Sequence, residues 1–416
     1  MRIHHNLIAL LILFSFACSS GNTSQENASE DTLSVDNAIA SEEPLFVQMA
    51  VSDIKRNPDP RLLDFREKPK WEYTNGLIAT AMLKVWEETG NDKFFNYAKY
   101  YADSMVNEDG SIKTYKKSDY NIDRVNPGKF LMELYKETGK ESYRLAIENL
   151  RDQMREHPRT SEGGFWHKKR YPHQMWLDGL YMGSPFLAQY AKEFNEPELF
   201  NDVANQFYLI NKYTWDEEEK VYYHGWDESR EQKWADPETG LSPNVWGRAM
   251  GWLAMASVDA LDYFPEDHPE REKIMTVVKN MAEAVKKWQD EETGVWYQVV
   301  NQPDREGNYL EASASSMFVY FLAKAVQEGY LDDEYMAVAR KGYEGLLEQF
   351  IEKNEDGTIS ITNVCSVAGL GGDPYRDGSY EYYINEPQRD NDPKGVGPFI
   401  MASLLFETMD ESAVAN

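Results

Sequence analysis

One stretch decides how the rest of the chain folds: His173-Gln-Met-Trp-Leu-Asp-Gly-Leu-Tyr-Met-Gly-Ser-Pro-Phe-Leu-Ala188. Its apolar and small residues fall on one helical stripe, which predicts a helix that begins near Leu177. Asp178 then lies in the first turn, where the helix dipole favours a carboxylate. Capping or charge complementarity explains that position equally well. The flanking Trp176 and Tyr181 instead indicate an acid in a slot lined with rings, as in a sugar site.

The rest of the chain repeats one unit, in which a turn ends a helix, a second helix follows, and a short extended piece leads onward. The turns contain Gly, Glu and Asn, and Gly at such a position favours a helix end. They lie at 87–90, 136–139, 194–197, 265–268 and 327–329, and helices are predicted after them up to about 106, 155, 213, 288 and 350. An opening helix over 45–56 and a closing helix over 395–409 bring the total to about twelve.

Twelve helices in six antiparallel pairs predict an all-α fold, a closed (α/α)6 barrel in which an outer ring of helices sheathes an inner ring. An open superhelical solenoid is the alternative, although it would need distinct capping repeats. The inner helices are expected to begin within 71–76, 120–128, 173–188, 244–252, 311–316 and 395–398, where Gly, aromatic and ionisable residues gather. One end of the barrel is therefore predicted to be the working face.

Acids and bases recur at these start points and on the extended pieces before them. They are Asp123, Asp178, Arg248, Glu311, His167 and His224. Two carboxylates that face each other across a groove suit glycosidic chemistry, because one gives a proton while the other activates water. Their approach is expected to raise the pKa of one of them. Asp123 has a second explanation as the N-cap of a helix over 124–135, and Glu311 also has a capping explanation.

Arg248 lies between Trp246 and Trp252, which is a poor setting for a solvated charge. It is expected to stack on an indole or to clamp a carboxylate with two parallel hydrogen bonds. Together with His224 and the basic run 168–170, it would form a positive patch for an acidic sugar. An ion pair with a buried acid is the structural alternative.

The composition excludes several function classes. The chain has 416 residues and a net charge of -28, which excludes a nucleic-acid partner because phosphate binding needs a basic face. Its aromatic fraction of 13% is what a groove that stacks on sugar rings requires. No metal is expected, because the seven histidines are scattered and no zinc or calcium ligand pattern occurs. No phosphate loop or dinucleotide fingerprint is present, so no cofactor is predicted.

The first 43 residues predict export. Residues 1–17 have the layout of a secretory signal, and Cys18 follows Ala17 as at a bacterial lipoprotein cleavage site, where the cysteine is acylated. Ser15 and Phe16 depart from the usual box, so ordinary export without lipid is the alternative. Residues 18–43 are predicted to be a disordered tether before a catalytic domain over 44–416. The expected location is the periplasm or the outer membrane of a bacterium, with membrane contact only through the lipid. Cys365 is predicted to be a small buried apolar residue.

Three motifs in order resemble those of a known family. They are the stretch 173–187, Ile122-Asp-x-x-Asn-x-Gly128 upstream, and Trp246-Gly-Arg-x-Met-Gly-Trp252 downstream. The chain resembles the unsaturated rhamnogalacturonyl hydrolases of glycoside hydrolase family 105, which are related to the unsaturated glucuronyl hydrolases of family 88. The resemblance covers the chain beyond the tether and implies the same (α/α)6 barrel of six helical hairpins.

The resemblance implies an exo-acting enzyme that removes a 4,5-unsaturated uronic acid from unsaturated uronyl oligosaccharides by hydrating an enol ether. Asp178 matches the family's general acid/base, and Asp123 matches a second carboxylate that orients Asp178 or binds the sugar. The remaining positions that match substrate contacts are Tyr73, His167, Trp176, Met182, His224, Trp246, Arg248 and Trp252.

Two other classes stay open from the residues alone. A sugar isomerase or epimerase on the same barrel would place catalytic histidine rather than aspartate at the centre. A non-catalytic surface glycan-binding lipoprotein would keep the Trp platforms without needing Asp178. The sequence also leaves open whether the uronate is galacturonyl or glucuronyl, because these sugars differ at one hydroxyl.

Overall fold

The computed structural model describes residues 43–414. The predicted signal peptide, Cys18 and nearly all of the predicted tether lie outside the described residues, so export and acylation stay predictions from the sequence. No helix within the described residues is long and apolar enough to cross a membrane.

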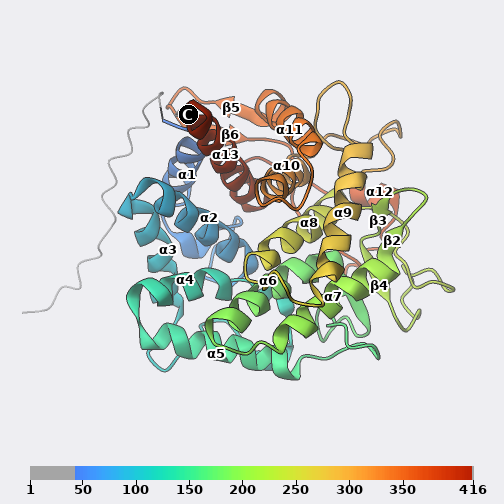
Figure 1. The fold of residues 1–416 in the computed structure, drawn as a ribbon, viewed down its shortest axis with the longest axis horizontal. Coiled ribbons are helices and arrows are strands. Elements are labelled where there is room, and N and C mark those ends of the chain that lie inside the picture. The colour runs from blue at the N-terminus through green and yellow to red at the C-terminus, as the bar shows by residue number, and fades with distance from the viewer. Residues whose placement is uncertain (1–42, 415–416) are drawn as a thin grey trace, which may run out of the picture. The chain divides into compact units, whose positions relative to one another are not determined.

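Twelve helices form two concentric rings (Figure 1). The inner helices are α2 (Tyr73–Thr89), α4 (Gly128–Thr138), α6 (Leu177–Glu193), α8 (Gly247–Leu261), α10 (Ala312–Gln327) and α13 (Pro393–Val414). The outer helices are α1 (Leu45–Arg56), α3 (Asp92–Met105), α5 (Glu141–Glu156), α7 (Leu199–Thr214), α9 (Arg271–Lys287) and α11 (Glu334–Phe350). Each inner helix packs against the next, and α13 returns to contact α2. The closed all-α barrel is therefore confirmed, and the open solenoid is not formed.

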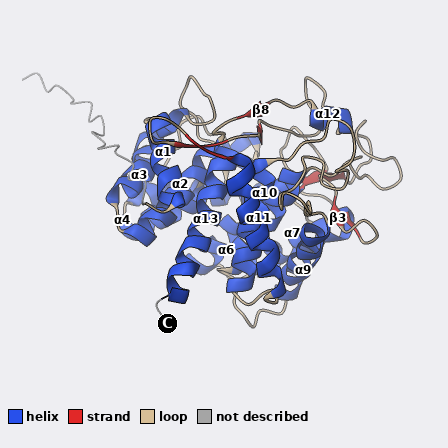
Figure 2. Cartoon of the chain, turned by 90° about the horizontal axis from the view of Figure 1, so that it is seen from above, coloured by secondary structure: helices blue, strands red, loops and turns tan. Residues whose placement is uncertain are grey.

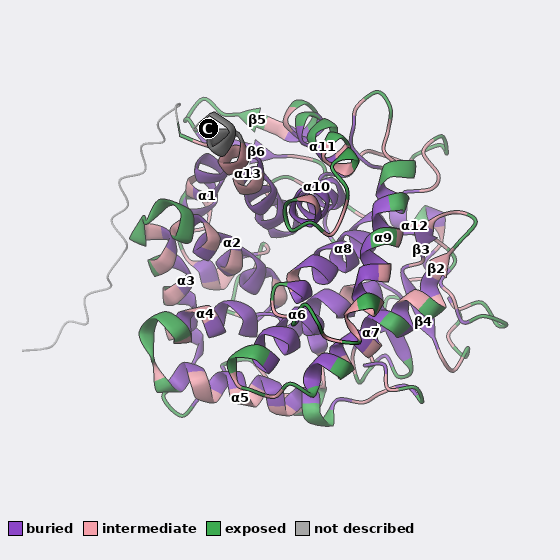
Figure 3. Cartoon of the chain, viewed as in Figure 1, coloured by how far each residue is buried: buried purple, intermediate pink, exposed green. Residues whose placement is uncertain are grey.

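The pattern of burial explains the two rings (Figure 3). The inner helix α10 is buried on nearly every side, as an apolar helix in a core must be. The outer helix α5 is amphipathic: Tyr143, Ile147 and Leu150 face the core, and each such buried side chain stabilises the fold by about 1.5–3 kcal/mol. Gly90 and Gly139 end α2 and α4 with positive φ values of 66° and 63°, which glycine adopts without strain.

Short strands and long loops connect the hairpins. Four two-stranded antiparallel sheets pair β1 (Gln174–Trp176) with β4 (Gly225–Asp227), β2 (Trp215–Asp216) with β3 (Val221–Tyr222), β5 (Ile351–Lys353) with β6 (Ile359–Ile361), and β7 (Val364–Cys365) with β8 (Gln388–Arg389). Figure 2 shows long loops and β8 above the helices, at the end from which α13 descends to its C-terminus. One helix, α12 (Tyr380–Ile384), was not predicted; it lies in the long segment between β7 and β8.

Aromatic rings and a buried lysine fill the middle of the barrel. Tyr181 stacks on Trp252 with ring centroids 4.7 Å apart, and Tyr73 meets the edge of Trp252 at 6.1 Å. The Nζ of Lys129 lies 3.6 Å from the centre of the Tyr181 ring and has no hydrogen-bond partner among the described residues. Burial lowers the pKa of Lys129 to about 7, against the opposing charge of Asp259. The barrel centre is thus closed by side chains.

Candidate active site

A pocket of about 300 Å³ opens where the inner helices begin. It is lined by Asp64, Arg66, Tyr73, Asp123, His167, Lys168, Arg170, Tyr171, Trp176, Asp178, Met182, Ser366, Val367, Ala368, Arg376, Arg389 and Lys394. A larger hollow of about 820 Å³ lies at the C-terminal ends of α2, α4, α6 and α8, but none of the predicted site residues lines it. The smaller pocket is therefore the candidate site, at the end that the sequence predicted.

Asp178 meets His224 at the floor of this pocket. The Oδ2 of Asp178 lies 3.2 Å from the Nε2 of His224, and both atoms are buried without an aligned hydrogen-bond partner. Local pairing creates the contact: Trp176 of β1 lies opposite Gly225 of β4, so Leu177 lies beside His224, and Asp178 comes next in the first turn of α6. The backbone N–H of Leu177 also donates to the His224 carbonyl at 3.0 Å.

The pKa of Asp178 differs from the sequence-based expectation. Burial raises this pKa, but the neighbouring imidazoles of His224 and His167 outweigh burial and leave it below its ordinary value. The expected rise is therefore wrong for Asp178. The reason is that two imidazole rings, rather than a second carboxylate, dominate the surroundings of Asp178.

Asp123 does not cap a helix. It lies in the 3-10 helix η3 (Ile122–Arg124), where the Asn121 side chain accepts its backbone N–H, and α4 begins only at Gly128. Its carboxylate pairs with Lys168 and lies 3.4 Å from the Nε2 of His167. Asp123 and Asp178 thus line the same pocket. Neither carboxylate caps a helix, although Asp178 does lie in the first turn of α6.

Stacked rings form one wall. The His167 ring lies parallel to Trp176 with centroids 4.3 Å apart and 14° between the planes, and Tyr171 stacks on the same indole at 5.0 Å. Burial and the charge of Lys168 hold the pKa of His167 well below its ordinary value, so the ring is neutral. With Met182 beside them, these rings offer a flat apolar face to a sugar.

Six lysine and arginine side chains line the pocket, although the chain as a whole is strongly acidic. Arg376 is the clearest of them: its Nε donates to the Gly371 carbonyl at 2.8 Å and its Nη2 to the Tyr171 hydroxyl at 2.9 Å. No carboxylate among the described residues lies within ion-pair distance of it. Arg66, Arg376, Arg389 and Lys394 were not predicted. The only signal for the last three was a group of basic residues in the segment 366–394, and Arg66 had none.

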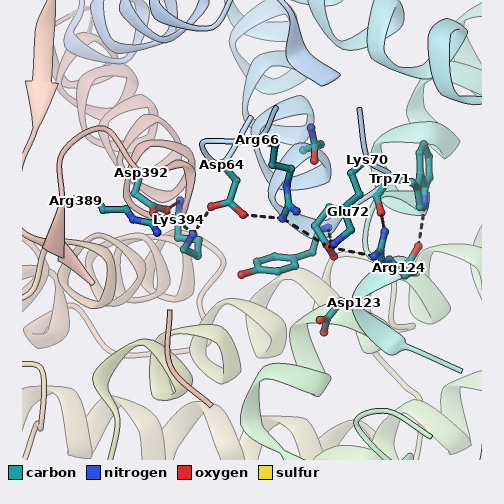
Figure 4. A network of polar contacts seen from close by, with 12 residues as sticks. Asp64, Arg66, Lys70, Trp71, Glu72, Asp123, Arg124, Arg389, Asp392 and Lys394 are labelled. Atoms are coloured by element: carbon teal, nitrogen blue, oxygen red, sulfur yellow. Dashed lines mark hydrogen bonds and ion pairs between the residues drawn. The ribbon is translucent and has the colours of Figure 1, made fainter. Parts of the chain in front are cut away.

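A row of alternating charges supports this basic wall (Figure 4). The buried Lys394 pairs with Asp392 at 2.7 Å and with Asp64 at 2.9 Å, and Asp64 pairs with Arg66 at 2.8 Å. Glu72 continues the row at 3.7 Å from Arg66. The row joins the start of α13 to the loop before α2, so it fixes the pocket wall at the point where the ring closes.

Arg248 lies behind the pocket rather than in its lining. Its guanidinium sits 4.7 Å above the Trp246 ring and donates to the Cys365 carbonyl and to Ser313 Oγ. Trp246 in turn packs against His224 with centroids 5.0 Å apart. The expected stacking on an indole is present, whereas Arg248 has no direct contact with the pocket. Cys365 is free and fully buried, as predicted.

Glu311, the remaining predicted acid, is structural. Its carboxylate caps α10 through the Ala314 backbone N–H at 2.7 Å and also accepts from Ser313 and from the Cys365 backbone N–H. It does not line the pocket. Within the part of the chain that the structure describes, no three His, Cys, Asp or Glu side chains gather as metal ligands do.

Comparison with known proteins places these features in context. The model of Glycosyl Hydrolase Family 88 matches residues 45–409. A glycoside hydrolase of family 105 from C. acetobutylicum ATCC 824 is similar in structure, with a TM-score of 0.85 and 46% identity over 88% of this chain and 100% of that one. Protein Atu3128 of Agrobacterium fabrum is 41% identical over 54% of this chain and 99% of that protein. The unsaturated 3S-rhamnoglycuronyl hydrolase of Formosa agariphila is 26% identical over 57% of this chain and 58% of that protein.

Proposed function

Because this chain belongs to glycosyl hydrolase family 88, we propose that it is an exo-acting hydrolase that removes a 4,5-unsaturated uronic acid from the non-reducing end of polysaccharide-lyase products. The observation that carries the proposal is the buried contact between Asp178 and His224 at the floor of a pocket lined with cations. Membership of a hydrolase family sets aside the isomerase and the non-catalytic alternatives.

The size and charge of the pocket support a single acidic sugar as the group that enters it. A volume of about 300 Å³ is at the small end for ligand sites, so one sugar ring fits and cleavage occurs at a chain end. Six cations against three carboxylates leave the pocket basic, which suits the carboxylate of a uronate. Arg376 is the best-placed partner for that carboxylate, because no protein acid occupies its guanidinium.

The reaction needs only water and the proton of Asp178. Asp178 gives its proton to C4 of the sugar as the C4–C5 double bond opens, and water adds to C5 and returns a proton to Asp178. The product is a hemiketal at C5. Its opening leaves a ketone at C5 and a hemiacetal at C1, which releases the rest of the oligosaccharide as an alcohol.

The substrate itself helps to protonate Asp178. Despite burial, the imidazoles of His224 and His167 lower the pKa of Asp178, so the acid form is scarce at neutral pH. A bound uronate brings a second negative charge and excludes water, and both effects raise the pKa of a neighbouring carboxyl group. Protonation of Asp178 is therefore coupled to substrate binding.

The other predicted residues have supporting roles in this proposal. Asp123, held by Lys168, binds sugar hydroxyls, while the rings of the pocket wall stack on the sugar. The wall residues are Tyr73, His167, Trp176 and Met182. Trp246, Arg248 and Trp252 form the layer behind them, which holds His224 and Tyr73 in place.

The test is to mix the purified protein with oligosaccharides from pectin lyase and from ulvan lyase and to follow the ultraviolet absorbance of the unsaturated uronate. We expect the absorbance to fall, and the faster substrate identifies the sugar. Asp178→Asn should lower kcat by at least about 100-fold while binding persists, since general acid–base catalysis contributes that much. The exposed Asp332→Asn is the matched control. An unchanged absorbance with both substrates would refute the proposed function.

A further inference from the structure

Both ring nitrogens of His224 have a defined neighbour, and His224 is completely buried. The Nε2 lies 3.2 Å from Asp178, and the Nδ1 lies 2.7 Å from the hydroxyl oxygen of Tyr383. Tyr383 is also completely buried, and its hydroxyl has no other hydrogen-bond partner among the described residues. Three segments that are distant in sequence therefore meet in one line: the start of α6, the residue before β4, and α12.

We propose that the Tyr383 hydroxyl fixes His224 as the tautomer with its proton on Nε2, so that Tyr383 is a positioning residue for Asp178. This inference rests on the proposed function for its catalytic part. A neutral imidazole has one N–H and one lone pair, and the hydrogen bond at one nitrogen decides the state of the other. A buried hydroxyl without an acceptor costs free energy, and Nδ1 is the acceptor in reach, so Tyr383 donates to Nδ1 and the proton of the ring faces Asp178.

The opposite tautomer is disfavoured twice. With the proton on Nδ1, the Tyr383 hydroxyl would have no acceptor, and a buried donor without a partner costs about 1–3 kcal/mol. The lone pair of Nε2 would then face the Asp178 carboxylate at 3.2 Å, which places two electron-rich atoms against each other. Both effects favour the proton on Nε2.

The surroundings of Tyr383 hold it in position. Ser379 caps α12 by accepting the Tyr382 backbone N–H at 3.1 Å, and the Tyr383 carbonyl accepts from Gln298 at 3.1 Å. The Tyr383 ring lies nearly parallel to Trp246, with centroids 6.2 Å apart. Gln298 also accepts the indole N–H of Trp246 at 3.2 Å. The hydroxyl is thus fixed from behind by groups that never reach the pocket.

The consequence for the reaction concerns the moment when Asp178 has given up its proton. The new carboxylate then faces an N–H rather than a lone pair, which stabilises the charge where it develops. Removal of the Tyr383 hydroxyl takes away one of the two preferences for the proton on Nε2, so the share of rings protonated on Nδ1 rises. The chemical step should suffer, whereas the walls and cations that bind the sugar remain in place.

The experiment uses the full-length protein with ¹⁵N-labelled histidine and compares wild type, Tyr383→Phe and Tyr382→Phe by nuclear magnetic resonance. His224→Gln assigns the signal among the seven histidines. Wild type should show a protonated Nε2 and a bare Nδ1, and Tyr383→Phe should shift the ring toward the other tautomer. Tyr382→Phe removes a hydroxyl from the same helix that binds Gly369 instead, so it should leave the signal unchanged.

Kinetics on the unsaturated oligosaccharides provide the second readout. Tyr383→Phe should lower kcat about 10- to 100-fold with KM within about twofold, because only the proton-transfer step is affected. A wild-type ring protonated on Nδ1 would overturn the proposal, and so would a Tyr383→Phe variant with unchanged kcat and tautomer. The spectrum is recorded without substrate. Inactivity of the wild type on these sugars would therefore contradict the proposed function but would leave the tautomer assignment of His224 unaffected.

Discussion

Glu311→Gln tests whether this acid serves the fold rather than the reaction. The Glu311 carboxylate is fully buried and satisfies two backbone N–H groups, at Ala314 and Cys365, with the Ser313 hydroxyl between them. An amide keeps one acceptor oxygen and replaces the other with an NH2 group. Whichever way the Gln side chain turns, one of the two backbone donors then faces another donor.

The magnitude follows from these contacts. One buried donor without an acceptor costs about 1–3 kcal/mol. The substitution also removes a buried carboxylate that is linked to the buried guanidinium of Arg248 through Ser313 Oγ. Loss of a directly paired buried charge costs about 3–5 kcal/mol, and this indirect link should cost a fraction of that. We expect Glu311→Gln to lower the free energy of unfolding by about 2–4 kcal/mol.

The assay is equilibrium unfolding in urea, followed by tryptophan fluorescence. The control is Glu348→Gln, which makes the same chemical change on the exposed face of α11 and should alter stability by less than about 0.5 kcal/mol. If Glu311→Gln and this control have the same free energy of unfolding, the assignment of Glu311 as a structural residue is wrong.

Two further predictions concern charged groups. Arg376→Ala should raise KM about 10- to 100-fold with a smaller effect on kcat, since hydrogen bonds to a charged group contribute about 1.5–3 kcal/mol. The control Arg305→Ala removes an exposed arginine outside the pocket lining and should leave KM unchanged. Equal KM values for the two variants would show that Arg376 does not bind the carboxylate of the substrate. Burial lowers the pKa of Lys129 from 10.5 to about 7 in the folded protein, so the unfolded chain binds more protons between these values. Stability therefore rises with pH in that window, by up to about 5 kcal/mol. Lys129→Met should abolish that rise, and parallel plots of unfolding free energy against pH for both proteins would contradict the shift.

The sequence predicted the helices well because their signals are local. The opening helix was expected over 45–56 and occupies Leu45–Arg56, and the helix expected up to 155 ends at Glu156. Apolar periodicity and turn glycines suffice for such elements. The short helix α12 has neither, since five residues in a long loop show no period, and it was missed although it carries Tyr383.

The acid at the floor of the candidate site was predicted from the sequence, but most of the basic residues in its wall were not. Asp178 stands at the start of a strongly patterned helix, so its place was readable from the sequence. The basic wall was not, because Arg376 and Lys394 reach the pocket from a segment about 200 residues later and only the closing of the ring brings them there. Arg248 shows the converse: its motif lies beside the site, but only three-dimensional packing reveals that its guanidinium points to Cys365.

The contact that closes the ring makes the backbone almost cyclic. The backbone N–H of Leu45 donates to the Glu407 carboxylate at 3.0 Å, although 362 residues separate them. A short linker between the start of α1 and the end of α13 would join the two ends, and the chain could be opened instead in the exposed turn at 265–267. Every hairpin of such a circular permutant would keep both of its neighbours. The order in which the ribosome makes the hairpins could therefore be changed without changing the barrel that they form.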